Sequence, residues 1–397
     1  MRTIFADYVS YILQLEQESR TDKFDAFRFD NVFPNCEFID RFVRLRNWIQ
    51  ENKKNFNLDE KKDAFTSWVD ADYWLFGLIY WIVFKNKSIT SDKSLIDKIS
   101  EFIPEAQIRQ DEPMSKHSSF RIGGPADVVV TVCSEEELSN ILSLLHSEDV
   151  RYMLIGNGSD LLFADEGYRG VIVKLGGDFE HIELLEEEDD VIRVGSARML
   201  SSTANFARDN GLAGLEFASG IPGTLGGALF MNAGAYGGEM KDVVESVTLM
   251  KSDGSSVYEL SGEEMKFSYR DSVLQHNDDI AIYARVRLHK DDKESISERM
   301  NDFTEKRRTK QPINFPSAGS TFKRPVGGYA AALIEDAGLK GRTVGGAQVS
   351  EKHSGFVINI GDATSKDVRG LIDIVAQEVE EHSGIKLEPE VRIIDAE

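Results

Sequence analysis

The sequence predicts an α+β protein of three successive domains that follow an all-α N-terminal domain. Three observations support this prediction. The first hundred residues are rich in aromatic residues, nearly free of glycine and periodic in the way of helices. Near residue 103 the pattern changes to strand, helix and strand, and a glycine-dense stretch then precedes further strands. We therefore place the N-terminal domain at 1–102 and the others at 103–175, 176–290 and 291–397.

The N-terminal domain is defined by apolar stripes at helical spacing, such as Ile12, Leu13 and Leu15. Its most apolar run is 73–84. A membrane span needs about 20 apolar residues, and this run ends at Lys85, so we expect a buried core helix. A membrane-facing or partner-binding surface is the alternative for this run, and the sequence gives no function for the domain.

The bulk composition excludes several classes of protein. With 46 Lys and Arg against 68 Asp and Glu, the formal net charge is −22, which disfavours nucleic-acid and anionic-membrane binding. Cys36 and Cys133 are too few for a disulfide framework, and the seven histidines are scattered, so no metal site is expected. Since the first residues lack the apolar run of a signal peptide, we expect a cytoplasmic protein.

The segment after residue 103 begins with a β-α-β unit. The valine-rich run 128–132 predicts a buried strand. Ser134 with Glu137 predicts a capping box that opens a helix, and 152–155 predicts the second strand. A helix over 201–210 should end at Gly211. Further strands are expected at 170–175, 191–195, 243–251, 256–260 and 280–288.

The last hundred residues predict a separate α+β domain. Its helices are expected at 294–308, 329–337 and 367–383. Gly338 is the stop signal of the second helix. The strands are expected at 344–349, 355–360 and 387–394.

Glycine is concentrated between Gly214 and Gly238, where eight fall in one stretch. Tight turns would explain one or two of them, usually beside polar residues. Here they alternate with apolar residues such as Leu225 and Phe230, which suit a buried wall. We therefore favour a loop whose bare backbone lies against a large ligand, with plain turns as the alternative.

A second glycine loop, Gly156-Asn-Gly-Ser-Asp-Leu-Leu162, leaves the strand at 152–155. It invites comparison with a dinucleotide-binding fold, but the third glycine of that fingerprint is absent and no long helix clearly follows. A loop that wraps a pyrophosphate without a helix behind it fits the pattern better.

The segments Gly220-Ile-Pro-Gly-Thr-Leu-Gly-Gly-Ala228 and Met231-Asn-Ala-Gly-Ala-Tyr-Gly237 closely resemble the flavin-binding core of the UDP-N-acetylenolpyruvoylglucosamine reductase (MurB) family. The resemblance spans roughly residues 105–397. It implies a two-subdomain FAD-binding module of the MurB and vanillyl-alcohol-oxidase type, followed by a substrate domain. Family members usually carry asparagine where this chain has Asp160. By resemblance, FAD is held by Gly156, Asn157, Gly158, Ser159, Asp160, Leu161, Gly220, Ile221, Pro222, Gly223, Thr224, Gly226, Gly227, Asn232, Gly234, Ala235, Tyr236 and Gly237.

Four residues of the last third stand out chemically, and each has an ordinary explanation. Arg270 could pair with Asp271 at the surface, and Lys310 could simply end a helix. Ser320 lies in a Gly-Ser turn, where a hydroxyl often bonds its own backbone, and Glu390 lies in a strand-like run. Taken singly, none of the four predicts a function.

Together these residues resemble the catalytic motifs of the same family. By resemblance, Arg270 is the active-site arginine of Tyr-Arg-Asp-Ser, Ser320 the proton donor of Gly-Ser-x-Phe, and Glu390 the glutamate of Leu-Glu-Pro-Glu-Val-Arg. The same resemblance assigns substrate binding to Tyr269, Lys310 and Arg324.

The reaction implied by the resemblance is the reduction of UDP-N-acetylglucosamine enolpyruvate to UDP-N-acetylmuramate, by NADPH through FAD. Charge that moves into the substrate carboxylate needs a fixed cation, which Arg270 supplies. Glu390 can donate a hydrogen bond only when protonated, and Ser320 would protonate the neighbouring carbon. Two alternatives stay open: an FAD-dependent oxidase or dehydrogenase of the same fold, and a non-catalytic scaffold whose N-terminal domain binds an unknown protein partner.

Overall fold

The structure is a computed structural model that describes residues 93–397. The helical domain predicted at 1–102 therefore lies outside the described residues, except for its last ten. These include helix α5 (Lys93–Ser100). Its Leu95 and Ile99 are buried together with Ile103 in the core of the domain that follows. This packing joins α5 to the following domain, and the predicted domain boundaries stay predictions.

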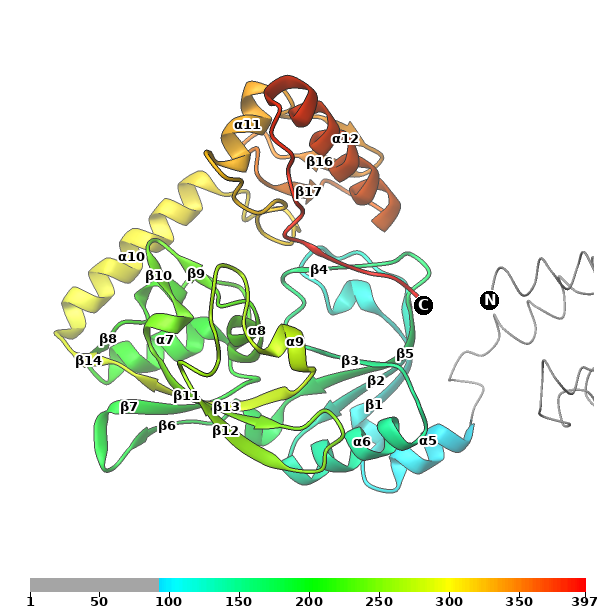
Figure 1. Cartoon of the computed structure of the whole chain (residues 1–397), viewed down its shortest axis with the longest axis vertical. Helices are drawn as coiled ribbons and strands as arrows, with labels where there is room; N and C mark the ends of the chain where they lie inside the picture. The colour runs from blue at the N-terminus through cyan, green and yellow to red at the C-terminus, as the bar shows by residue number, and fades with distance from the viewer. Residues whose placement is uncertain (1–92) are drawn as a thin grey trace, which may run out of the picture. The chain divides into compact units, whose positions relative to one another are not determined.

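The first subdomain is built on a four-stranded sheet of order β1-β2-β5-β3. Its central strand β5 is parallel to both neighbours, β2 and β3. The predicted β-α-β unit is therefore present, with β5 inserted between its two strands. Helices α5 and α6 lie beside this sheet (Figure 1). The elements are β1 (Ile108–Pro113), β2 (Pro125–Val132), α6 (Glu135–Ser147), β3 (Tyr152–Ile155) and β5 (Tyr168–Leu175).

Helix α6 begins at the predicted cap. The Ser134 side chain accepts a hydrogen bond from the Glu137 N–H at 3.2 Å, which satisfies one of the free donors of the first turn. The expected reciprocal bond differs in one respect. The Glu137 carboxylate accepts from the Cys133 N–H at 2.7 Å, one residue before the cap. The glutamate therefore fixes the chain that enters the helix rather than closing a capping box.

The second subdomain is built on an antiparallel sheet of order β12-β11-β13-β7-β6. All four strands that the sequence predicts here are present, and the helix predicted at 201–210 is α7, with Gly211 at positive φ after it. The sheet strands are β6 (Ile182–Leu185), β7 (Glu188–Gly195), β11 (Val244–Met250), β12 (Val257–Ser261) and β13 (Ile280–Arg287). The other elements are η7 (Gly177–Glu180), α7 (Leu200–Asp209), β8 (Leu212–Ala213), η8 (Glu216–Ala218), α8 (Leu225–Phe230), β9 (Gly234–Ala235), β10 (Gly238–Glu239), η9 (Met240–Asp242), α9 (Leu274–Asn277) and β14 (His289–Lys290).

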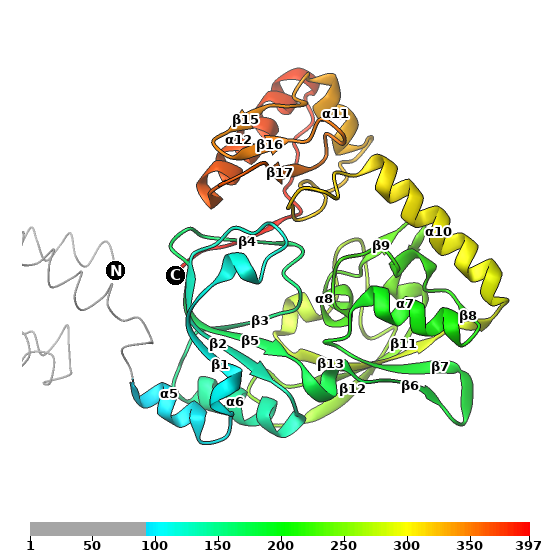
Figure 2. The ribbon, with the colours of Figure 1, turned by 180° about the vertical axis from the view of Figure 1, so that it is seen from behind.

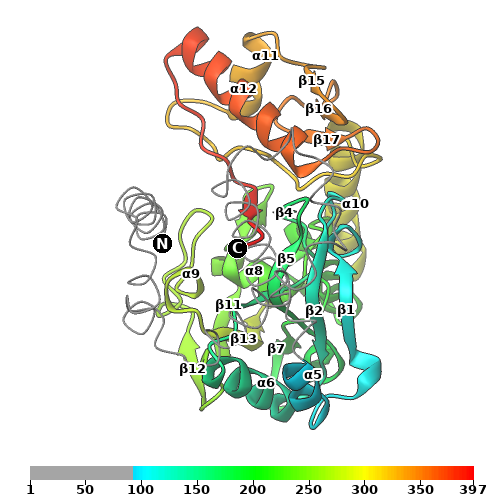
Figure 3. The same cartoon turned by 90° about the vertical axis from the view of Figure 1, so that its right-hand side faces the viewer.

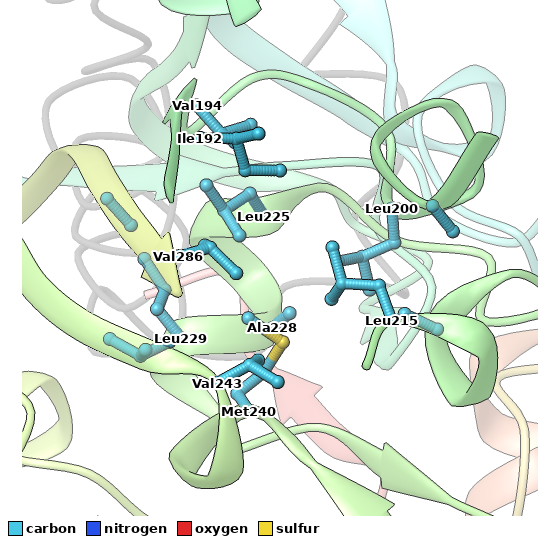
Figure 4. Close-up of a cluster of buried hydrophobic side chains, with 14 of the residues drawn as sticks. Ile192, Val194, Leu200, Leu215, Leu225, Ala228, Leu229, Met240, Val243 and Val286 are labelled. Carbon is cyan, nitrogen blue, oxygen red and sulfur yellow. The ribbon is translucent and has the colours of Figure 1, made fainter. Parts of the chain in front are cut away.

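The core of this subdomain lies between the sheet and the helices of the glycine-rich stretch. Figure 4 shows side chains from α8, such as Leu225 and Leu229, pointing toward Ile192, Val194 and Val286 of the sheet. All five are fully buried. The apolar residues between the glycines are therefore a wall of the core, which leaves the glycine backbone on the other side free for a ligand.

The C-terminal domain packs helices α11 and α12 against a three-stranded sheet (Figure 2). Helix α10 leads into it, and its length exceeds the predicted 294–308 by a few residues. The elements are α10 (Lys293–Lys310), α11 (Ala330–Asp336), β15 (Thr343–Val344), β16 (Ala347–Val349), β17 (Val357–Asn359) and α12 (Ser365–Ser383).

The prediction of one continuous strand at 344–349 is wrong. The run 344–349 is not a single strand but the hairpin of β15 and β16. Gly345 has φ 52, and this left-handed conformation turns the chain back on itself. The two glycines at 345 and 346 are the turn signal that the apolar residues around them obscure.

The last strand, β18 (Arg392–Ile394), leaves the C-terminal domain and pairs in parallel with β4 (Leu161–Phe163). It covers only the end of the strand predicted at 387–394. Figure 3 and Figure 1 show the red end of the chain beside the first subdomain. The chain end thus returns to the strand that directly follows the glycine loop 156–160.

Candidate active site

Two glycine loops meet where the first two subdomains join. The loop 156–160 follows β3, and the segment 220–227 leads into α8. A Cβ on Gly156 would lie 2.4 Å from the Thr224 Oγ1, far inside van der Waals contact. Only glycine at 156 leaves room for the Thr224 side chain, so the backbone of one segment lies directly against a side chain of the other.

Polar contacts hold the two segments together. The Asn157 side-chain amide donates to the Pro222 carbonyl at 3.1 Å. A Cβ on Gly223 would come within 3.4 Å of the Ser159 Oγ. The junction therefore offers main-chain groups rather than bulky side chains, which fits the binding of a phosphate or a flavin by backbone N–H groups.

Helix α8 begins at Thr224, whose side chain accepts from the Gly227 N–H at 3.5 Å. Gly227 is exposed, and a Cβ there would meet only the Thr224 Oγ1, at 3.8 Å. Gly226 differs, because its Cβ would press on Ser196 at 3.1 Å. A side chain at 226 would therefore crowd Ser196, whereas the protein leaves room for one at 227.

The second half of the glycine-rich stretch is ordered by Asn232. This residue is fully buried, and its side-chain amide donates to Glu239 Oε2 at 2.6 Å and to the Ser268 carbonyl at 2.9 Å. Its side-chain oxygen accepts from the Lys241 N–H at 3.0 Å. The polar groups of Asn232 are therefore occupied by the protein, and its cofactor contact stays a prediction.

Tyr236 lies at the rim of this stretch, in the hairpin of β9 and β10. Its ring stacks on Phe303 of α10, with centroids 4.6 Å apart and planes 5° from parallel. The next residue, Gly237, has φ 92, and a Cβ there would meet no atom within 4 Å. The hairpin is thus supported from one side and open at Gly237.

The predicted catalytic residues Arg270 and Glu390 form an ion pair. Arg270 Nε donates to Glu390 Oε1 at 2.6 Å, and the two side chains are only 24% and 11% exposed. Arg270 has φ 58, a conformation that costs energy for a residue with a Cβ and is concentrated at functional sites. The two residues are 120 positions apart in the sequence, so their contact depends on the tertiary fold.

The predicted proton donor Ser320 lies beside this pair. The next residue, Thr321, accepts through its carbonyl a hydrogen bond from the Glu390 N–H at 2.8 Å. Ser320 is an exposed residue, and among residues 93–397 its hydroxyl has no hydrogen-bond partner. The serine is therefore held next to Glu390 by backbone, with its hydroxyl free for a substrate.

Of the predicted substrate-binding residues, two lie at this site. The Tyr269 hydroxyl accepts from the Arg324 N–H at 3.2 Å, and the Arg324 guanidinium lies 4.2 Å from the centre of the Tyr329 ring. Lys310 is the exposed last residue of α10. In the described part of the chain it contacts none of the other predicted catalytic or substrate-binding side chains.

Comparison with known proteins shows the family to which the chain belongs. Residues 126–258 match the model of an FAD binding domain, and residues 311–394 match that of the UDP-N-acetylenolpyruvoylglucosamine reductase C-terminal domain. The chain is 48% identical over 300 residues to the UDP-N-acetylenolpyruvoylglucosamine reductase of Caldanaerobacter subterraneus subsp. tengcongensis, covering 76% of this chain and 98% of the relative. The chain belongs to the UDP-N-acetylenolpyruvoylglucosamine reductase family. The reductase of Clostridioides difficile is 47% identical, over 77% of this chain and 99% of its own length.

A solved structure supports the same assignment. The UDP-N-acetylenolpyruvylglucosamine reductase (MurB) of Thermus caldophilus superposes with a TM-score of 0.63 at 34% identity, over 72% of this chain and 99% of its own. The predicted family and the predicted α+β fold are thereby confirmed. These matches cover about three quarters of this chain and leave about a quarter of its residues without a counterpart.

Asp160 has surroundings that sequence reasoning missed. Its carbonyl accepts from the Arg392 N–H at 3.0 Å, and its Oδ2 is buried without a hydrogen-bond partner. Burial, reinforced by the negative charge of Glu390, raises the pKa of Asp160 to about 7, although Arg392 and Arg270 act in the opposite direction. The carboxyl in the cofactor loop thus belongs to the same group of charges as the catalytic pair.

Arg307 is a second residue that the sequence did not single out. Burial lowers the pKa of its guanidinium, and a Cβ on Gly220 would lie 3.0 Å from its Cδ. Its neighbours on α10 are neutralised, since Lys306 pairs with Asp302 and Arg308 pairs with an acid as well. Arg307 lies three residues before Lys310, so both side chains are on one face of α10. This spacing is the sequence feature that could have identified Arg307.

Two further properties concern the described residues as a whole. Within 93–397, no group of three or more His, Cys, Asp or Glu side chains is placed to hold a metal ion. In the same range, no helix combines the length and the apolar character that crossing a membrane requires.

Proposed function

We propose that this chain catalyses the NADPH-dependent, FAD-mediated reduction of UDP-N-acetylglucosamine enolpyruvate to UDP-N-acetylmuramate. The observation that carries this proposal is the ion pair of Arg270 and Glu390 beside Ser320, in a chain 48% identical to a named reductase. The reaction supplies a peptidoglycan precursor and so serves cell-wall biogenesis, cell shape and cell division. Because NADPH and UDP-sugars are cytoplasmic metabolites, we also propose a cytoplasmic location.

The FAD would lie against the two glycine loops, where it supplies the transfer of reducing equivalents from NADPH to the double bond. Bare backbone at Gly156, Gly223 and Gly227 supports this placement, because side chains there would occupy the space or force the loops apart. The remaining loop residues of the predicted set would orient the cofactor through their main chain.

The chain's own residues would handle the charge and the proton. Arg270 offers a fixed, forked cation to the substrate carboxylate, which gains charge as the double bond is reduced. To do so it must share its donors between Glu390 and the substrate, and only Nε is engaged in the pair. Ser320, with its hydroxyl free, would donate the proton to the carbon next to the carboxylate.

The diphosphate of the substrate would be bound by the face of α10 that carries Lys310, with Tyr269 and Arg324 closer to the sugar and carboxylate. Cations without an acid partner suit this task, since they have no internal charge to give up before they bind a phosphate. Lys310 in the described residues has no ion pair, in contrast to Lys306 and Arg308.

The alternative is an FAD-dependent oxidase or dehydrogenase acting on another substrate. The glycine loops alone would serve it equally well. Arg270, Glu390 and Ser320 weigh against it, because a partly buried arginine–carboxylate pair beside a free hydroxyl fits the protonation of a substrate that carries a carboxylate. A partner for the N-terminal domain, 1–102, stays a prediction.

The test uses the purified protein and its visible spectrum. We expect flavin absorbance, anaerobic bleaching by NADPH, and recovery of the colour on addition of the enolpyruvyl substrate. Ser320→Ala should bleach at a near-normal rate and recover about 10² to 10⁴ times more slowly, which is the usual loss for a general acid. A colourless protein that takes up no FAD would exclude the proposed function, and recovery at the normal rate in Ser320→Ala would exclude the serine as proton donor.

A further inference from the structure

The carboxyl group of Asp160 is not explained by cofactor binding alone. Its backbone is fixed, because Asp160 directly precedes β4 and its carbonyl accepts the Arg392 N–H of β18. Its Oδ2 is buried and finds no donor among the described residues. A buried carboxylate oxygen without a donor is unfavourable, whereas a protonated carboxyl costs much less. The position therefore favours a neutral Asp160.

The groups that face Asp160 are two cations and one anion. Arg270 and Glu390 come from the catalytic pair, and Arg392 comes from β18, where its guanidinium lies 4.5 Å from the centre of the Phe230 ring of α8. Since Glu390 is already bound to Arg270 at 2.6 Å, it repels a second negative charge nearby. Burial together with this repulsion raises the pKa of Asp160 to about 7.

The state of Asp160 sets the net charge of this group of four. With Asp160 protonated, two arginines face one carboxylate and the net charge is positive. With Asp160 ionised, the charges cancel. The proposed substrate brings a carboxylate of its own, which the positive state attracts and the neutral state does not.

We propose that Asp160 is a positioning residue that must hold one proton for the enolpyruvyl carboxylate to bind beside Arg270. This inference rests on the proposed function and adds a pH dependence to it. At a pH above the pKa of Asp160, substrate binding is then accompanied by the uptake of one proton from solvent, which is bound by the Asp160 carboxylate. Asparagine, which is neutral at every pH, reproduces the binding-competent state without the titration.

The experiment measures the dissociation constant of the enolpyruvyl substrate at pH 6 and pH 8.5, from its effect on the spectrum of the oxidised flavin. One-proton linkage weakens binding by up to tenfold for each pH unit above the titration. The ratio of the two constants should therefore be about ten or more in the natural chain and close to one in Asp160→Asn. The matched control is Asp302→Asn, the same change at an exposed ion pair on α10, which should keep the ratio of the natural chain.

Failure of this inference differs from failure of the proposed function. If the substrate leaves the spectrum unchanged at pH 6, the proposed function fails. If it binds, but with the same ratio in the natural chain and in Asp160→Asn, the role of Asp160 is overturned. Should Asp160→Asn not fold, infrared spectra of the natural chain decide: a protonated carboxyl band that is lost between pH 6 and 8.5 supports the inference, and its absence at pH 6 overturns it.

Discussion

Replacing Gly227 by alanine should change stability and cofactor affinity in opposite directions. The methyl group would lie 3.8 Å from the Thr224 Oγ1 and meet no closer atom of the described chain, so the apoprotein accommodates it. Gly227 lies in the first turn of α8. At a position whose backbone conformation alanine can adopt, replacing glycine by alanine stabilises the protein by about 0.4–1 kcal/mol. The apoprotein should therefore be more stable to urea by about that amount.

The same methyl group occupies the space in which the proposed cofactor would lie. If the FAD touches the backbone at Gly227, it must shift or lose contact, and we expect its dissociation constant to rise by about tenfold or more, that is by at least ~1.4 kcal/mol. Fluorescence of free FAD on titration with apoprotein measures this constant. Urea unfolding of the apoprotein measures the other effect.

The matched control is Gly370→Ala in the middle of α12. A Cβ at Gly370 would meet only Val344 Cγ1, at 3.9 Å, and this helix belongs to the C-terminal domain. The Gly370→Ala protein should gain about as much stability as Gly227→Ala, and its affinity for FAD should be unchanged. A Gly227→Ala protein that is more stable and binds FAD as tightly as the natural chain would show that this backbone does not touch the cofactor.

Three further predictions concern the described domains. Arg270→Met should destabilise the protein by about 3 kcal/mol because it leaves Glu390 unpaired and nearly buried, and adding Glu390→Gln should restore much of the loss; additive losses in urea unfolding would contradict the ion pair. A chain that begins at Ile103 lacks α5 with its fully buried Ile99, so it should melt at lower temperature than one that begins well before α5, and equal melting temperatures would refute the packing of α5. Asp160 has a raised pKa in the folded protein, so its contribution to stability is full below about pH 4 and is lost as the pH rises to about 7. A pKa raised to about 7 corresponds to a loss of at most about 4 kcal/mol, so the free energy of unfolding of Asp160→Asn should rise relative to that of the natural chain between about pH 4 and about pH 7. A difference between the two proteins that does not change with pH would contradict the raised pKa.

Much of the fold follows from local sequence. The valine run of β2 is buried on both faces, as expected for a strand that lies between two neighbours in a covered sheet, and α7 ends just before Gly211. The run 344–349 shows the limit of this reasoning. Its apolar residues suit a single strand, and the turn signal of Gly345 and Gly346 becomes decisive only with the positive φ of Gly345. A positive φ is a property of the folded chain, and glycine permits it without requiring it.

The candidate site was predicted from motifs rather than from contacts. No spacing in the sequence joins Arg270 to Glu390, because their contact depends on the path of the chain through two domains. The charge state of Asp160 could not be predicted from the sequence either. It depends on Arg392 and Glu390, which reach it only because β18 pairs with β4, and no local pattern predicts that parallel pairing.

The pairing of β18 with β4 also explains how one site can be assembled from three domains. The strand fixes Arg392 beside Asp160, and Glu390 lies two residues before it, hydrogen-bonded to Thr321 of the C-terminal domain. Glu390 is thus held by a strand of the first subdomain and a loop of the third, while Arg270 reaches it from the second. The raised pKa of Asp160 therefore depends on the pairing of β18 with β4, which brings Glu390 and Arg392 close to it. Loss of this pairing would break the hydrogen bond from the Arg392 N–H to the Asp160 carbonyl and remove the positive charge of Arg392 from the surroundings of Asp160.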